Sequence, residues 1–213
     1  MVSNKNTVCE HNSLDMTPFF IRTLVKFLSK LLLIVASSAS APFAISEELS
    51  ADLEHDFISC SMLTTEHLTL LQLAQRGLNE REALAELPFR NKNAKARVSQ
   101  VYALIAQEGI LDAYSLVNSN YARCAQLVFE AKGKPAADLL EYPYYFCAGE
   151  NRVRYEIILR INQSFNLDLV LAQTPDAYFD VAINYFKLIK NKGLLASFDY
   201  TANNLKACLS QIE

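Results

Sequence analysis

Four cysteines are the clearest candidates for chemistry in this sequence. Cys60 and Cys124 are separated by almost the same number of residues as Cys147 and Cys208. The four are widely spaced and form no CxxC or CxxH pair, which zinc sites commonly use. An even number of cysteines in an exported chain is typical of a disulfide framework. We therefore predict disulfide bonds, with metal binding as the alternative.

Histidine and acidic side chains are the other residues with chemical potential. His55 and His67 each have an acid beside them, but they are too far apart on one helix to share a metal ion. We expect solvated histidines and no metal site. A glycosidase needs two facing carboxylates about 5 to 9 Å apart, and the sequence alone does not pair any. Acids gather before the first helix at Glu47, Glu48, Asp52, Glu54 and Asp56.

Motifs of known enzymes are absent from the sequence. There is no HExxH, no GxSxG and no phosphate-binding loop. We therefore expect no catalytic residues and no cofactor. Two other function classes stay open: an envelope enzyme that acts on peptidoglycan or polysaccharide through paired carboxylates, and a carrier of lipid or another small ligand.

Residues 1–41 have the order of a secretory signal peptide. An apolar run, "LLLIVASS", is followed by the small residues "ASA", and the run is well below the ~18 residues of a membrane span. Basic residues precede it, namely Arg22, Lys26 and Lys30. We expect cleavage near residues 39–41, with an uncleaved anchor as the alternative and Met16 as a possible true start. Removal also takes away Cys9, the fifth cysteine.

Two stretches of equal length, residues 60–88 and 147–175, both open on Cys and close on Pro. When each unit is aligned forward from its first Cys and backward from its second, the length difference falls in the loop after the Pro. Asn79 then meets Asn166, and Gly109 meets Gly193. This pattern indicates a duplicated sequence, with residues 42–134 and 135–213 as the two units.

Apolar residues in the third helix of each unit fall at i, i+3, i+4 and i+7. Such spacing places them on one stripe that must be buried against neighbouring helices. The stripes are Val98, Val101, Tyr102 and Ile105, and Ala182, Tyr185, Phe186 and Ile189. We expect Tyr102 and Phe186 to be largely buried at equivalent positions.

The sequence predicts an all-α fold of two tandem, divergent four-helix units, each stapled by one disulfide. Gly77 and Asn79 mark a helix–turn–helix pivot, and Gly109 and Gly193 are expected to end helices. The expected helices are 62–76, 80–87, 94–108 and 112–131, then 150–163, 167–173, 176–192 and 198–211. With an even number of antiparallel helices the two ends of a unit meet. Of three possible connectivities, this favours Cys60–Cys124 and Cys147–Cys208.

The first unit resembles a group of small exported bacterial proteins of unassigned function. These proteins show a Cys, a helix that breaks at Gly, a Val-Tyr helix and a closing Cys. The matching segments are "SC", "AQRGLNEREAL", "RVSQVYALI" and "YARC", all within residues 60–124. The second unit matches loosely, because Phe186 replaces the Tyr. The resemblance implies a disulfide-bracketed helical unit and brings no activity with it.

An aromatic segment, "LLEYPYYFCAGE", joins the two units. Aromatic residues are common where one surface packs on another, within a chain or between chains. The candidate partner contacts are Tyr142, Tyr144, Tyr145 and Phe146. Packing between the units is the alternative role for these rings.

These patterns indicate an exported, periplasmic or secreted protein that binds another envelope or secreted protein, as an adaptor or an inhibitor. Its formal net charge of -3 argues against a general nucleic-acid binder. No segment after the signal peptide is apolar enough for a stable membrane span. A basic segment containing Arg90, Lys92, Lys95 and Arg97 could touch anionic lipid or polysaccharide, and a solvated loop is the alternative.

Overall fold

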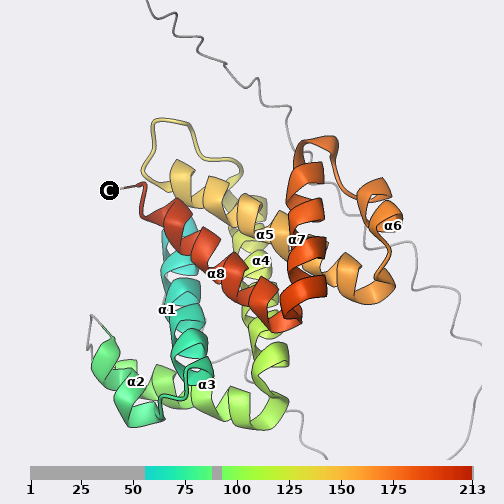
Figure 1. The fold of residues 1–213 in the computed structure, drawn as a ribbon. Helices are drawn as coiled ribbons and strands as arrows, with labels where there is room; N and C mark the ends of the chain where they lie inside the picture. The colour runs from blue at the N-terminus through green and yellow to red at the C-terminus, as the bar shows by residue number, and fades with distance from the viewer. Residues whose placement is uncertain (1–55, 88–92, 213) are drawn as a thin grey trace, which may run out of the picture. The chain divides into compact units, whose positions relative to one another are not determined.

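All regular secondary structure in the part of the chain that the structure describes is helical (Figure 1). The computed structural model describes residues 56–87 and 93–212, and these belong to one compact unit. The helices are α1 (Phe57–Gln75), α2 (Glu80–Glu86), α3 (Ala94–Glu108), α4 (Ile110–Lys132), α5 (Glu141–Ser164), α6 (Leu167–Ala172), the 3-10 helix η2 (Asp176–Tyr178), α7 (Phe179–Lys192) and α8 (Leu194–Leu209).

The all-α prediction is therefore confirmed, and most of the expected helices lie close to the observed ones, whereas α5 begins at Glu141 instead of residue 150. The signal peptide, the start at Met16, the acidic stretch before Asp56, His55 and the basic residues Arg90 and Lys92 lie outside the described residues. Within residues 56–87 and 93–212, no helix combines the length and the apolar character needed to cross a bilayer.

The pivots between the first two helices of each half, α1–α4 and α5–α8, form as the sequence predicts. Asn79 and Glu82 form a reciprocal capping box, in which the side chain of each accepts a hydrogen bond from the backbone N–H of the other, at 3.1 and 2.9 Å. In the second half, the Asn166 side chain accepts from the backbone N–H of Leu169 at 3.3 Å. Leu169 has no carboxylate, so the second half has only one of these two bonds.

Gly109 and Gly193 separate the last two helices of each half, as expected. Their backbone N–H groups donate to the carbonyl oxygens of Ile105 and Ile189, both at 2.9 Å. Both glycines have φ +83°, with ψ of 164° and 170°. This extended, positive-φ conformation differs from the left-handed helical cap that we expected, and it is open essentially only to glycine.

The two predicted disulfides are confirmed. Cys60 of α1 is bonded to Cys124 of α4 with a Cα–Cα distance of 5.9 Å, and Cys147 of α5 to Cys208 of α8 at 5.8 Å. Both distances are normal for a disulfide. Each bond joins the first and last helix of its own half, which is where antiparallel order brings the chain ends together.

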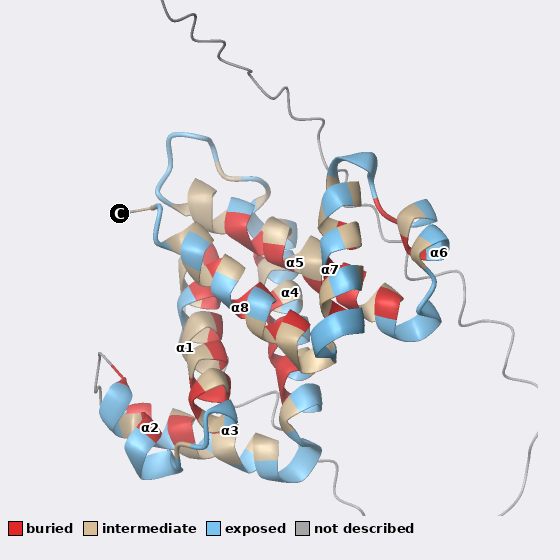
Figure 2. Cartoon of the chain, in the orientation of Figure 1, coloured by how far each residue is buried: buried red, intermediate tan, exposed pale blue. Residues whose placement is uncertain are grey.

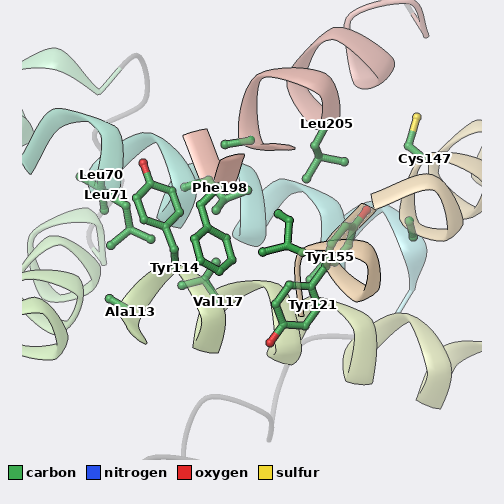
Figure 3. Close-up of a cluster of buried hydrophobic side chains, with 14 of the residues drawn as sticks. Leu70, Leu71, Ala113, Tyr114, Val117, Tyr121, Cys147, Tyr155, Phe198 and Leu205 are labelled. Atoms are coloured by element: carbon green, nitrogen blue, oxygen red, sulfur yellow. The ribbon is translucent and has the colours of Figure 1, made fainter. Parts of the chain in front are cut away.

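The helices of the two halves share one hydrophobic core. Helices α1, α4, α5 and α8 contact one another across the boundary between the halves, while α2 and α3 pack only within the first half and α6 and α7 only within the second. Residues coloured as buried occur along all four of these helices (Figure 2). The core includes Leu70, Leu71, Tyr114, Val117, Tyr121, Tyr155, Phe198 and Leu205 (Figure 3).

The contacts between the halves have the pattern of a two-fold relation. α1 packs on its counterpart α5, α4 packs on its counterpart α8, and the α4–α5 contact is matched by an α1–α8 contact. An interface in which each surface meets its own equivalent is isologous. This arrangement fits the duplication that the sequence indicates, and the connection between the halves spans residues 133–140.

The expectation that Tyr102 and Phe186 are both largely buried is met only in part, because each side chain is of intermediate exposure and packs against the hydrophobic core. The fully buried ring of this stripe is Tyr185, one residue earlier. The two positions are nevertheless equivalent in their contacts. The Tyr102 hydroxyl donates to the carbonyl oxygen of Leu78 at 2.6 Å, and the Phe186 ring lies 5.2 Å from that of Phe165, the counterpart of Leu78. In each half the third helix therefore contributes buried side chains to the core and also supports the pivot.

Candidate functional site

The aromatic segment between the halves begins a helix instead of forming a free connection. Tyr142, Tyr144 and Tyr145 lie in the first two turns of α5, which starts at Glu141, earlier than predicted. Pro143 is tolerated there because the N–H groups of a helix's first turn have no intrahelical acceptor. The helical start fixes the directions of all these side chains.

The inner tyrosines pack against the first half of the molecule. The Tyr145 ring meets Phe57 edge-on at 5.3 Å and stacks with Phe129 at 6.1 Å. Burial, with a smaller contribution from Tyr142, raises the pKa of the Tyr145 hydroxyl. The Lys134 ammonium lies 5.8 Å from the centroid of the Tyr142 ring, within cation–π range. Tyr145 thus takes part in the packing between the halves, which was the alternative role predicted for these rings.

The outer side of the same segment exposes large apolar side chains. Leu139 is 53% exposed, Leu140 69% and Phe146 40%. We call Leu139, Leu140, Tyr142 and Phe146 the linker surface. Tyr142 and Phe146 were predicted partner contacts. The sequence-based prediction of partner contacts did not include the two leucines, although they are adjacent apolar residues directly before the helix start.

Two carboxylates of the described residues form short ion pairs with arginines. Arg97 of α3 binds both carboxylate oxygens of Glu66 on α1, with N–O distances of 2.7 and 3.0 Å. Arg154 binds Glu150 one turn earlier in α5 at 3.0 Å, and the Tyr178 hydroxyl donates to the same carboxylate at 2.5 Å. Burial is the main cause that raises the pKa of Tyr178, and the bond to Glu150 adds to it. These arrangements join helices, and none of them presents two facing carboxylates.

A polar cluster crosses between the halves on the α1–α8 side. The Gln72 side-chain amide donates to Asp199 at 2.6 Å and to Asn203 at 2.9 Å, and its carbonyl oxygen accepts from the Lys206 ammonium. Burial lowers the pKa of Lys206, and the neighbouring Asp199 opposes that shift. The sequence did not predict this cluster, because its members lie on helices at opposite ends of the chain.

His67 of α1 is a titratable group of intermediate exposure with one shielded ring nitrogen. Its Nε2 atom is inaccessible to solvent and has no hydrogen-bond partner among the described residues. Burial lowers the pKa of the imidazole, Glu66 raises it and Arg97 lowers it further. The expectation of a solvated histidine is met only in part for His67, because its Nε2 atom is shielded while the residue as a whole is of intermediate exposure. The apolar spacing placed Leu70 and Leu71 in the core, and His67 lies one turn before them on the same helix.

No group of three or more His, Cys, Asp or Glu side chains within residues 56–87 and 93–212 is arranged to hold a metal ion. Of the predicted site residues, the structure pairs the four cysteines and gathers the aromatic segment at the start of α5. Comparison of the chain with family models, curated proteins and solved structures found no match.

Proposed function

We propose that this protein is an exported, non-catalytic module that binds another envelope or secreted protein through the linker surface. The observation that carries the proposal is the exposure of Leu139 and Leu140 directly before α5 and of Phe146 in its second turn. Exposed apolar side chains that lie singly need no explanation, but a cluster at a fixed helix end favours a binding role.

The rest of the molecule supports this role by holding the surface rigid. Tyr145, whose ring centroid lies 6.3 Å from that of Tyr142, packs on Phe57 and Phe129 of the first half, and the Cys147–Cys208 disulfide anchors α5 one residue after Phe146. A preordered surface loses little conformational freedom on binding, which favours affinity. The two disulfides also agree with an oxidising compartment such as the periplasm or the cell exterior.

A site-specific crosslinking experiment tests the proposal. A photo-crosslinking residue at position 140 in intact envelopes should capture one defined protein, whereas the same residue at the exposed position Lys187 on α7 should not. The captured protein, once purified, should bind the wild-type chain and lose at least about tenfold in affinity with Leu140→Asp, because a charge replaces an apolar contact. Equal capture at both positions, or unchanged binding by the variant, would contradict the proposal.

A further inference from the structure

Two of the contacts between the halves, α4–α5 and α1–α8, are equivalent in the two-fold pattern but carry different polar side chains. Each disulfide lies within one half, so neither of them joins the halves. The halves are held together by non-covalent contacts and by the connection at residues 133–140. The side chains at these contacts therefore decide which half can pair with which.

A buried pair of asparagines lies at the α4–α5 contact. The Asn151 side-chain amide of α5 donates to the Oδ1 atom of Asn118 on α4 at 3.0 Å, and the Asn118 amide donates to the carbonyl oxygen of Tyr114 at 2.9 Å. Both asparagines are buried. Alignment from the cysteines places Ala202 and Thr64 at the equivalent positions of the α1–α8 contact. The bond between two side-chain amides has no counterpart there, because alanine has no polar side-chain atom.

The α1–α8 contact has a polar cluster of its own, centred on Gln72. The Gln72 side chain binds three residues of α8, namely Asp199, Asn203 and Lys206. On the other side of the molecule, the position equivalent to Gln72 is Leu159 of α5. The positions equivalent to the three residues of α8 carry small, uncharged side chains on α4, namely Ser115, Ser119 and Ala122. Each of the two equivalent contacts thus has a polar cluster that the other lacks.

Pairing of two second halves would leave both kinds of polar group without their partners. Asn151 would meet the methyl group of Ala202 in place of Asn118, and its Oδ1 atom already has no hydrogen-bond partner within residues 56–87 and 93–212. Leu159 would lie against the charged residues of α8 in place of Gln72. A buried polar group that loses its partner costs free energy, and the native pairing avoids that cost.

Pairing of two first halves would lose polar contacts as well. Gln72 would meet the small, uncharged side chains of α4 in place of the charged residues of α8. The hydroxyls of Ser115 and Tyr155 lie 2.9 Å apart across the α4–α5 contact, and Ser115 would instead meet Leu68. Both polar clusters are complete when a first half pairs with a second half.

We propose that the boundary between the halves is a heterotypic recognition surface. A first half pairs with a second half, of its own chain or of another copy of this chain, and like halves do not pair. Buried asparagines have this role in coiled coils, where one such residue fixes register and oligomeric state. The connection gives the native partner a local concentration on the order of millimolar, so the discrimination is measured best when the connection is cut.

Cleavage of the connection tests the recognition with all residues of the chain present. A site-specific protease sequence inserted after Pro135 lets the folded, oxidised protein be cut between its halves. After the cut protein has been dissociated in urea and diluted, with both disulfides intact, native mass spectrometry counts the pairs by mass. Each cluster should contribute at least about tenfold, so unlike pairs should exceed like pairs by about a hundredfold.

Variants that copy the equivalent positions should weaken the discrimination. Asn118→Ala with Asn151→Thr copies Ala202 and Thr64, and the ratio of unlike to like pairs should fall by about tenfold because second halves no longer bury an unpaired amide. Gln72→Leu copies Leu159 and tests the other cluster independently, with a similar fall caused by pairs of first halves.

Asn120→Ala is the matched control, because Asn120 is an exposed asparagine on the same helix as Asn118. It should leave the ratio of unlike to like pairs unchanged. The proposal is overturned if the cut halves do not reassemble as unlike pairs, if like pairs are as abundant as unlike pairs, or if neither boundary variant lowers the ratio.

Discussion

Tyr114 of α4 and Phe198 of α8 occupy equivalent positions in the two halves and stack on each other, with ring centroids 5.8 Å apart and an interplanar angle of 14°. Both side chains are buried. Figure 3 shows the two rings next to each other in the core, at the contact between α4 and α8. The Tyr114–Phe198 contact therefore contributes to the free energy of unfolding of both halves.

Truncation at this pair should destabilise the whole molecule. We expect Tyr114→Ala and Phe198→Ala each to cost about 3 to 5 kcal/mol, because each removes a buried ring and leaves a cavity. Leu127→Ala, at a side chain 48% exposed on α4, should change stability by less than about 1 kcal/mol. Chemical denaturation followed by circular dichroism measures all three. A loss confined to one half, seen as two transitions, would mean that the halves do not share a core.

The Glu66–Arg97 ion pair should be replaceable by valines, which are the residues at the aligned positions of the second half (Val153 and Val181). We expect Glu66→Val alone and Arg97→Val alone each to cost about 1 to 3 kcal/mol, since each leaves a partly buried charge without its partner. The double variant, which copies Val153 and Val181, should lie within about 1 kcal/mol of the wild type. A double-mutant cycle by urea denaturation gives the coupling. Simple additivity of the two losses would show that the helix contacts of the halves are not equivalent.

Glycines between helices and a glycine inside a helix should respond to alanine in opposite directions. Gly109→Ala and Gly193→Ala should each cost about 1 to 3 kcal/mol, because φ +83° with extended ψ is strained for a side chain even where the added Cβ meets open space. Gly149→Ala, inside α5 and equally unobstructed, should instead stabilise by about 0.5 to 1 kcal/mol. Thermal unfolding of the three variants provides the comparison, and a stabilising Gly109→Ala would refute the backbone argument.

Each disulfide should stabilise the complete molecule. Removal of either bond, by Cys60→Ala with Cys124→Ala or by Cys147→Ala with Cys208→Ala, should cost about 2 to 4 kcal/mol. Because the halves share one core, either double variant should still unfold in one transition, at a lower denaturant concentration. Calorimetry can separate this result from independent unfolding of the two halves, which would appear as a second heat absorption peak.

Local signals made most helix boundaries predictable. Asn79 with Glu82, Gly109 and Gly193 each act within a few residues of their position, so the sequence alone indicates where helices begin and end. The start of α5 was misplaced, because Pro143 among tyrosines is typical of a connection. Only the structure shows that Pro143 falls in the first turn, where it costs no hydrogen bond.

Contacts between distant helices were beyond the reach of the sequence. Arg97 and Glu66 lie on different helices, and the sequence does not indicate which charged residue of one helix binds which residue of the other. The shielding of the His67 Nε2 atom had a weak signal, since His67 lies one turn before Leu70 and Leu71 in the core stripe. The disulfide pairing was predictable, because helix count and chain direction fix which ends meet.

The connectivity of the disulfides has a consequence for biosynthesis. Cys60 pairs with the next cysteine in the described chain, Cys124, and Cys147 with the next, Cys208. When a chain enters an oxidising environment with its N-terminus first, Cys124 follows Cys60 before Cys147 and Cys208 arrive. Each cysteine can therefore bond to its native partner before the next pair is present. Oxidation in order of emergence gives the correct bonds directly, without the slow thiol–disulfide exchange that interleaved pairs require. The first half can be closed covalently while the second is still being delivered.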